Sequence, residues 1–110
     1  MATYQVVDEH RASYPYAVEL KVGDQVVVTA KEEGGWVWCI GRDARGAWVP
    51  NGYLERRGEQ GTVRVAYSSA ELTVRVGDRV SCSREAEGWL WCVSQTGERG
   101  WIPKAKLRRR

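Results

Sequence analysis

The chain of 110 residues contains no phenylalanine and only one histidine. Without phenylalanine, the hydrophobic core has to be built from Trp, Tyr, Val, Leu and Ile, of which Trp buries the largest area per side chain. The single histidine, His10, and the three cysteines provide neither a Cys-x-x-Cys pair nor a tetrahedral Cys/His set. We therefore expect the protein to have no metal site and no cofactor.

Sequence signals of enzymes and of membrane proteins are missing as well. There is no Gly-rich phosphate-binding loop and no Gly-x-Ser-x-Gly nucleophile elbow. The N-terminus has no basic segment followed by an apolar run, and no apolar run approaches the ~20 residues that span a bilayer. These absences predict a non-enzymatic, cytoplasmic protein without a signal peptide or a membrane segment.

Positive charge is concentrated at the C-terminus. The formal net charge is +3, yet five of the 17 basic residues lie in the last seven positions, and the remaining 12 are outnumbered by 14 acidic residues. The tail is therefore expected to be a solvated basic terminus on a net negative body. A nucleic-acid partner is disfavoured, because no basic face interleaves with the tryptophans. The five residues of the tail are Lys104, Lys106, Arg108, Arg109 and Arg110.

The chain does contain a block that occurs twice. Gly-Trp-Val-Trp-Cys at 35–39 is repeated as Gly-Trp-Leu-Trp-Cys at 88–92, and each copy is followed by a Trp-Val-Pro or Trp-Ile-Pro motif. The two copies hold all six tryptophans of the protein, with the same spacing inside each copy. The duplication predicts two small domains, at 1–57 and 62–110, joined by a short linker at 57–61.

Short β-branched and aromatic runs separated by turn residues predict an all-β fold with essentially no α-helix. Gly23-Asp24 and its counterpart Gly77-Asp78 are turn signals. The polar stretch at 8–19 is expected to be a long loop, whereas its counterpart at 68–71 is much shorter. Closing each sheet into a barrel would remove most of its exposed edges. The expected strands are 4–7, 25–31, 36–40, 47–50, 62–67, 79–84, 88–94 and 99–103.

These motifs, in this order and spacing, are similar to the Src-homology-3 (SH3) pattern. Gly-Asp-x-Val begins at Gly23, Gly-Trp at Gly35, and Gly-x-Trp-Val-Pro-x-x-Tyr-Leu at Gly46. The Trp-Val-Trp-Cys run and the tandem arrangement resemble bacterial variant SH3 proteins. The resemblance implies two tandem SH3-like barrels packed through a short linker. It also implies a protein-interaction module that binds a short extended or proline-containing peptide.

The resemblance further implies which residues form the peptide groove. The family's Ala-Leu-Tyr-Asp-Tyr run falls on 6–10, where both tyrosines are missing, so Tyr14 and Tyr16 are the expected replacements. In the second repeat Lys106 replaces the groove tyrosine, so binding is expected in the first repeat. The expected groove residues are Trp36, Pro50, Tyr53, Tyr14, Tyr16 and Glu19 in the first repeat, and Trp89, Pro103 and Tyr67 in the second.

The remaining tryptophans and the cysteines have competing interpretations. Trp38 and Trp91 share a sheet face with Trp36 and Trp89 but are expected to be packing residues, as are Trp48 and Trp101. Cys82 and Cys92 could lie on neighbouring strands, yet reduced, buried thiols are the simpler expectation for all three cysteines. A catalytic thiol is disfavoured, because the second repeat keeps the cysteine without any histidine.

Two alternative functions stay open at this point. Small β-barrels with surface aromatic rings and a basic tail can bind nucleic acid. The tandem could also be purely structural, with each groove covered by the other unit.

Overall fold

The computed structural model describes residues 1–110 and is all-β, with two single turns of 3-10 helix and no α-helix. The all-β prediction is confirmed, and several strands begin and end within a few residues of their expected bounds. The elements are β1 (Ala2–Val6), β2 (Glu19–Leu20), β3 (Gln25–Glu33), β4 (Trp36–Ile40), β5 (Gly46–Pro50), η1 (Asn51–Tyr53), β6 (Leu54–Arg57), β7 (Gln60–Val63), β8 (Tyr67–Ser68), β9 (Arg79–Ala86), β10 (Trp89–Ser94), β11 (Arg99–Pro103), η2 (Lys104–Lys106) and β12 (Leu107–Arg109).

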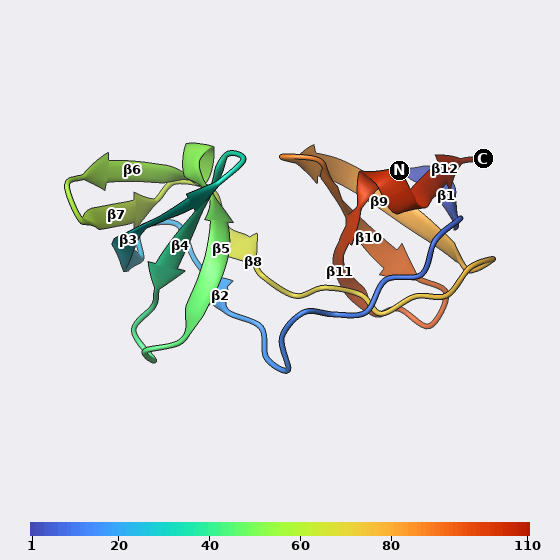
Figure 1. The fold of residues 1–110 in the computed structure, drawn as a ribbon, viewed down its shortest axis with the longest axis horizontal. Helices are drawn as coiled ribbons and strands as arrows, with labels where there is room; N and C mark the ends of the chain where they lie inside the picture. Colours follow the sequence, from blue (N-terminus) through green and yellow to red (C-terminus); the bar gives the residue numbers. More distant parts are fainter. The chain divides into compact units, whose positions relative to one another are not determined.

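The strands form two compact units. One, here called the terminal unit, consists of Met1–Tyr16 and Ala70–Arg110, and the other, the central unit, consists of Ala17–Ser69. The strand order is β11-β10-β9-β1-β12 in the terminal unit and β5-β4-β3-β7-β6 in the central unit, which also contains the β2-β8 pair. The two sheets have matching strand orders, so the predicted pair of similar all-β units is confirmed (Figure 1).

The two repeats exchange their first strands. β1 starts the first repeat, but it pairs with β9 and β12 of the second repeat, with Tyr4 opposite both Val80 and Arg109. Conversely, β7 starts the second repeat and pairs with β3 and β6 of the first, with Thr62 opposite Gln25. Figure 1 shows the blue β1 among orange and red strands. The compact units therefore differ from the contiguous division into 1–57 and 62–110.

The segment that was expected to be a linker, 57–61, is instead a hairpin of the central unit. Arg57 pairs with Gln60, and Gly58 takes the turn with a φ of 59°. The chain passes from one unit to the other at two different places, between residues 16 and 17 and between residues 69 and 70. Each crossing lies in the segment that follows the first strand of a repeat, 7–24 or 64–78, so the expectation of a much shorter second loop is wrong.

Strand alternation builds a separate core in each unit. Val6, which is fully buried, packs in the terminal unit against the buried residues Leu72, Val74, Val80, Cys82, Leu90, Cys92 and Ile102. Val63, which is 1% exposed, takes the corresponding place in the central unit, because it pairs with Leu54 as Val6 pairs with Leu107. Each core is thus completed by a valine that comes from the other repeat.

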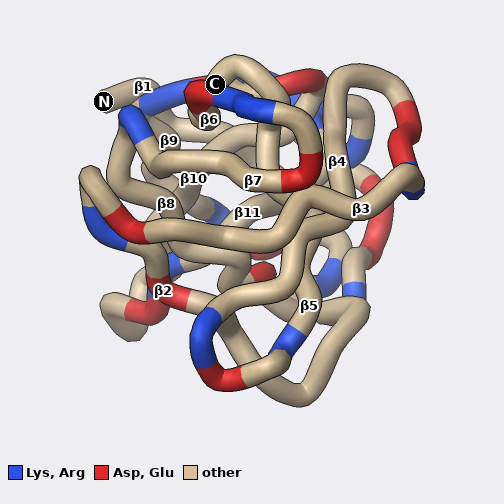
Figure 2. The backbone as a smooth tube through the Cα atoms, turned by 90° about the vertical axis from the view of Figure 1, so that its left-hand side faces the viewer, with Lys and Arg blue, Asp and Glu red and all other residues tan.

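The turn-forming role of the two Gly-Asp pairs is confirmed. Asp24 Oδ2 accepts a hydrogen bond of 2.9 Å from the backbone N–H of Lys21, and Asp78 Oδ2 accepts one of 2.9 Å from that of Arg75. The glycine before each aspartate has a φ of 95°, in the left-handed region that glycine adopts without strain. Figure 2 shows that the turn between β4 and β5 also carries charges of both signs.

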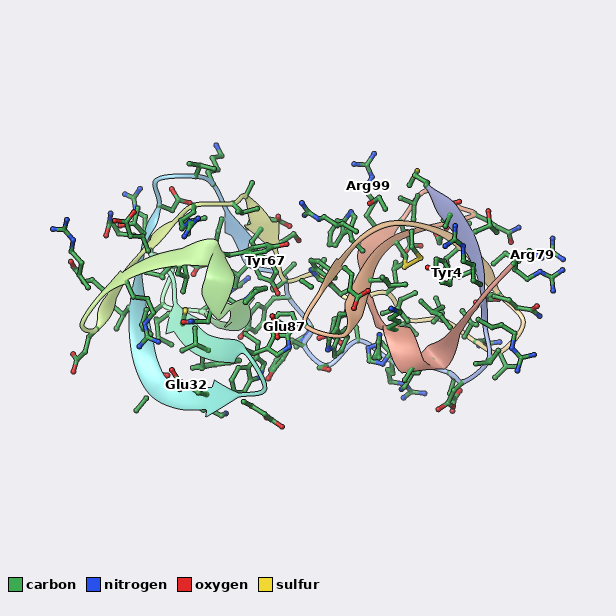
Figure 3. The ribbon with its side chains drawn as sticks, turned by 90° about the horizontal axis from the view of Figure 1, so that it is seen from above. Tyr4, Glu32, Tyr67, Arg79, Glu87 and Arg99 are labelled. Carbon is green, nitrogen blue, oxygen red and sulfur yellow. A yellow bond between two sulfur atoms is a disulfide. The ribbon has the colours of Figure 1, made fainter.

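Two of the three cysteines are joined. Cys82 on β9 is the cross-strand partner of Cys92 on β10, and the two form a disulfide (Figure 3). The expectation of three reduced thiols is therefore wrong for this pair, because the register brings their Cα atoms within 4.1 Å. In the central unit Val28 stands opposite Cys39, which remains a free, buried cysteine.

Candidate functional site

A row of aromatic residues and one proline lies along β4, β5 and η1 of the central unit, where Trp36 and Tyr53 are half-buried and Pro50 is buried. Trp36 at the start of β4 is the cross-strand partner of Pro50 at the end of β5. Pro50, with a φ of −58°, begins the 3-10 turn that ends at Tyr53. The turn is attached to the preceding hairpin because the Asn51 N–H donates to the Gly35 carbonyl at 2.9 Å. The local fold thus sets Trp36, Pro50 and Tyr53 next to one another.

Tyr67 extends this row, although it belongs to the second repeat. Its ring lies edge-on to Tyr53, with ring centroids 5.8 Å apart and an interplanar angle of 84°. Its hydroxyl donates a hydrogen bond of 2.8 Å to the Trp48 carbonyl on β5. The sequence assigned Tyr67 to the groove with Trp89, and the strand exchange places it in the central unit instead. Repeat spacing alone carries no signal for this exchange.

A second aromatic pair lies on the same face of β4 and β5. Trp38 and Trp48 are cross-strand partners, with ring centroids 5.4 Å apart. The ammonium group of Lys31 is 5.1 Å from the Trp38 ring and 5.2 Å from the Trp48 ring, which is the geometry of a cation–π contact. The Trp38 indole also lies directly on Gly46, where a Cβ atom would be 2.2 Å from the ring. This tight contact agrees with the predicted packing role of Trp38.

The acidic and tyrosine residues expected in the first groove are divided between the units. Glu19 belongs to the central unit, where its Oε1 accepts a hydrogen bond of 2.9 Å from Ser68 Oγ across the β2-β8 pair. Tyr14 and Tyr16 belong to the terminal unit, and their ring centroids are 5.9 Å apart. Within the central unit, Tyr67 takes the place that Tyr14 or Tyr16 was expected to fill.

The terminal unit repeats the framework with different side chains. Trp89 pairs with Pro103 across β10 and β11, as Trp36 pairs with Pro50. His10 is the counterpart of Tyr67, and its ring lies edge-on to Trp89 at a centroid distance of 5.4 Å. Lys106, at the end of η2, is the counterpart of Tyr53. Both tyrosines of the central row are therefore replaced by polar, ionisable side chains.

These polar side chains form a connected chain of hydrogen bonds. The Lys106 ammonium donates to the Glu9 carbonyl at 2.9 Å and lies 3.3 Å from His10 Nδ1. His10 Nε2 lies 2.8 Å from Glu71 Oε1, so these partners assign the proton to Nε2 and leave Nδ1 as the acceptor. Glu71 also accepts from the Ser13 hydroxyl at 3.0 Å. Sequence reasoning missed Glu71, because its approach to His10 depends on the exchanged β1.

Cys39 lies in the core, where burial disfavours the nucleophilic thiolate form. Its side chain is 2% exposed, and burial raises the pKa of the thiol from 9.0 to about 11, against a smaller opposing effect of Arg56. Cys92, its counterpart, is held in the disulfide. The prediction that these two cysteines are core residues is confirmed.

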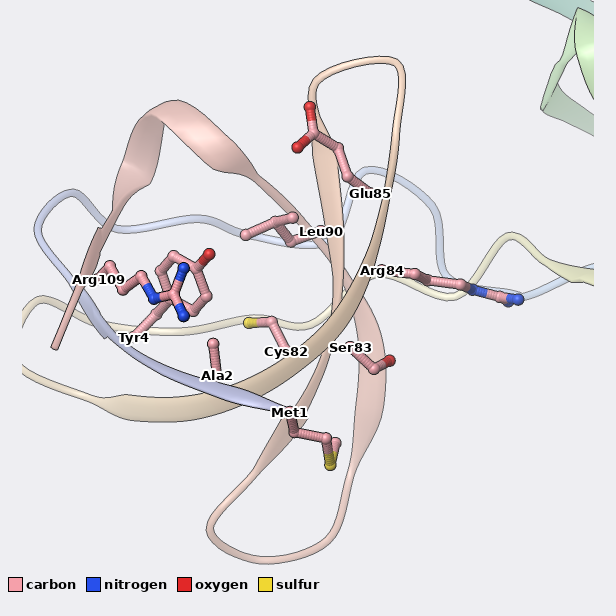
Figure 4. A pocket seen from close by; sticks show the side chains of 9 residues that line it. All are labelled: Met1, Ala2, Tyr4, Cys82, Ser83, Arg84, Glu85, Leu90 and Arg109. Atoms are coloured by element: carbon pink, nitrogen blue, oxygen red, sulfur yellow. The ribbon is translucent and has the colours of Figure 1, made fainter.

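A cavity of about 420 Å³ opens in the terminal unit, at the end of the barrel where β1 begins. Cys82 points into it beside Tyr4 and Leu90, and Arg109 lies close to Tyr4 (Figure 4). None of the residues that the sequence assigned to a groove lines this cavity. The remaining lining residues are Met1, Ala2, Ser83, Arg84 and Glu85.

Comparison with known proteins confirms the predicted SH3-like fold of the two units. A family model described as "Variant SH3 domain" matches residues 3–57 and 63–109. "SH3 and PX domain-containing protein 2B" of Mus musculus is 28% identical over 123 residues, covering 96% of this chain and 13% of that protein. The Homo sapiens protein of the same name has the same identity and coverage. The chain thus spans only 13% of the length of these relatives. No solved structure matches, and no helix is long and apolar enough to cross a membrane.

Proposed function

Because the chain belongs to the variant SH3 domain family, we propose that it is a non-enzymatic protein-interaction module whose central unit binds a short extended or proline-containing peptide. SH3 domains are non-catalytic interaction modules as a class. The observation that carries the finer proposal is the row formed by Trp36, Pro50, Tyr53 and Tyr67. A peptide in the polyproline II conformation is already extended and loses little entropy on binding such a row.

The row is pre-organised by contacts that do not involve a ligand. Tyr67 is held by its hydrogen bond to the Trp48 carbonyl, and Tyr53 is held against the Tyr67 ring. Rings fixed in this way lose little side-chain entropy when a ligand arrives. Trp36 and Tyr53 are half-buried, whereas Pro50 and Tyr67 are buried. A shallow contact of this kind suits micromolar-class affinity, about 8 kcal/mol of binding free energy.

Charge gives the peptide a preferred composition. Glu19 is exposed at the start of β2 in the central unit. It lies one strand position from Tyr67, because Glu19 pairs with Ser68 and Leu20 pairs with Tyr67. A lysine or arginine near one end of the peptide would pair with this carboxylate, which contributes up to about 1 kcal/mol at an exposed site. The proposed ligand is therefore an extended segment that contains proline and one basic residue.

The terminal unit is proposed to bind such a peptide more weakly. Trp89 and Pro103 are present, but Lys106 and His10 stand where the central unit has tyrosines. An ammonium group is a poor surface for proline rings because it must remain hydrated or hydrogen-bonded. Tyr14 and Tyr16, close to the crossing at residues 16 and 17, are proposed to belong to this second, weaker surface.

The proposal is tested with a peptide array or pull-down screen on three proteins: wild type, Trp36→Ala and Trp89→Ala. The two substitutions remove the same ring from matched positions. Trp36→Ala is expected to weaken binding at least tenfold, and Trp89→Ala is expected to leave the bound set nearly unchanged. An unchanged set with Trp36→Ala contradicts the groove assignment. A loss with Trp89→Ala alone would transfer the function to the terminal unit.

A bacterial source and a cytoplasmic location are proposals that rest on the sequence alone. The Cys82–Cys92 disulfide weighs against the second, because disulfides are rare in reducing compartments. Alkylation of the protein during cell lysis tests the point. Labelling of Cys82 and Cys92 would support a reducing compartment, and protection of both would contradict it.

A further inference from the structure

The basic C-terminus is part of the terminal unit's sheet and not a solvated tail. Leu107–Arg109 forms β12, which pairs with β1 along its length. The pairing continues to the last residue, because the Arg110 N–H donates to the Thr3 carbonyl at 2.9 Å. The expectation of a solvated terminus is therefore wrong, and the side chains of the terminal residues have fixed faces.

Strand alternation separates these side chains into two sets. Val6 and its partner Leu107 point into the core, so Gln5 and its partner Arg108 point outward. Gln5 is also the partner of Arg79 on β9, which places a second arginine on the same outer face. Figure 3 shows Tyr4 inside the barrel and Arg79 outside it.

Arg110 completes a cluster of three guanidinium groups. Its Nη1 donates a hydrogen bond of 2.7 Å to Oε1 of Gln5. Gln5 lies between Arg79 and Arg108, because it is the cross-strand partner of both. All three arginines are exposed, and none takes part in the three ion pairs of the structure. Thr3, Gln5 and Ser81, which lie on β1 and β9, are neutral and polar. The arginine face consists of Arg79, Arg108 and Arg110 with Thr3, Gln5 and Ser81.

The central unit shows that the fold does not require this charge. Its corresponding face is formed by β3, β7 and β6 in the same order. Glu55 stands where the terminal unit has Arg108, Gln25 where it has Arg79, and Arg57 where it has Arg110. This face carries one charge of each sign, whereas the arginine face carries three positive charges and no negative one.

A purely structural explanation accounts for only part of the cluster. Basic side chains on an edge strand discourage pairing with other chains, and β12 is an edge strand. Arg79, however, lies on β9, which has neighbours on both sides. Protection of the sheet edge therefore leaves Arg79 unexplained.

We infer that the arginine face binds the sugar–phosphate backbone of a nucleic acid. Guanidinium groups match phosphate oxygens in a bidentate geometry. Arg108 and Arg110 are two residues apart on a strand, about 6.6 Å, which is of the order of the distance between successive phosphates. The hydroxyl groups of Thr3 and Ser81 and the amide of Gln5 supply further donors of the kind that contact phosphates.

The composition of the arginine face also argues against base stacking and against insertion into lipid. None of its six residues has an aromatic ring on which a base could stack, and none of the six is apolar. Binding is therefore independent of base sequence and depends strongly on salt. This surface is distinct from the aromatic row of the central unit and does not depend on the proposed peptide binding.

The test compares two triple variants of equal charge by fluorescence anisotropy with a labelled 20-base-pair DNA duplex. One variant is Arg79→Gln/Arg108→Gln/Arg110→Gln. The control, Arg42→Gln/Arg57→Gln/Arg64→Gln, removes three exposed arginines from the central unit. With three phosphate contacts, log K of the wild type should fall against log salt with a slope of about −2.7, or roughly 40-fold between 50 and 200 mM salt. The control should keep this slope, and the first variant should lose most of the binding.

Three outcomes overturn the inference. Equal loss in both triple variants would mean that net charge alone governs binding. Displacement of the DNA by a poly-glutamate of equal charge, at equal concentration, would mean that the face accepts any polyanion. Binding to vesicles that contain phosphatidylserine, without binding to DNA, would assign the face to a membrane surface. The thermal unfolding of each variant is compared with wild type, so that loss of binding is attributed only to a folded protein.

Discussion

Val6 and Val63 offer a matched pair of substitutions that tests the exchange of first strands. The two residues hold corresponding positions, and their exposed fractions are 0% and 1%. Val6 belongs to the first repeat by sequence but completes the core of the terminal unit, whereas Val63 belongs to the second repeat but completes the central unit. Each valine should therefore stabilise the unit built mainly from the other repeat.

The magnitude follows from the atoms that are removed. Valine to alanine deletes two methyl groups, worth about 1.6 kcal/mol of burial, and the cavity left behind raises the cost to about 2–3 kcal/mol. The corresponding increase in the opening equilibrium of the affected unit is about 30- to 150-fold. Neither substitution adds a polar group or changes a charge, so the two effects are directly comparable.

Native-state hydrogen exchange measures the effect in each unit separately. Val6→Ala should accelerate exchange of the protected amides of β10 and spare those of β4. Val63→Ala should accelerate exchange in β4 and spare β10. If Val6→Ala instead accelerates hydrogen exchange in β4 and spares β10, the repeats fold as contiguous domains and do not exchange their first strands. Equal acceleration of both strands by both variants would likewise contradict two separate cores.

Three further predictions concern the cysteines and one glycine. Reduction of Cys82–Cys92 opens the loop that the disulfide closes in the unfolded chain, so the unfolded state gains entropy and the terminal unit should lose about 3 kcal/mol of stability. Denaturant unfolding with and without reductant measures this loss, and no change would contradict the disulfide. Because the pKa of Cys39 is raised from 9.0 to about 11, its contribution to stability is complete below pH 9 and is lost as the pH rises through 11, by up to about 3 kcal/mol. The difference in unfolding free energy between wild type and Cys39→Ala should shrink over this range, and a constant difference would refute the shift. Gly100→Ala would place a Cβ atom 2.7 Å from the backbone of Leu72, so it should lower the melting temperature, whereas Gly52→Ala, in open space, should not.

Local features of the fold could be predicted because they depend on short-range chemistry. The Gly-Asp turns, the β-branched run of β3 and the burial of Cys39 all follow from residue type and alternation. The strands expected at 36–40 and 47–50 are also present, and they form a hairpin in which Trp36 pairs with Pro50.

The exchange of strands could not be predicted, since the two repeats offer nearly equivalent places for either first strand. Val6 and Val63 are the same residue at the same position, so the core gives no preference between the two pairings. Consequently Tyr67 was assigned to the wrong neighbours, and 57–61 was taken for a linker. The disulfide depends on a register that the sequence left open, and the Glu71–His10 contact depends on the exchange itself.

The central claim is that one groove combines residues of both repeats, and a peptide titration followed by nuclear magnetic resonance tests it without any substitution. A proline-containing peptide selected from the array is added to protein labelled in its tryptophan and tyrosine side chains. The account predicts that the signals of Trp36, Tyr53 and Tyr67 shift together with one dissociation constant, while the indole signal of Trp89 stays in place. A shift of Tyr67 together with Trp89, and without Trp36, would contradict it.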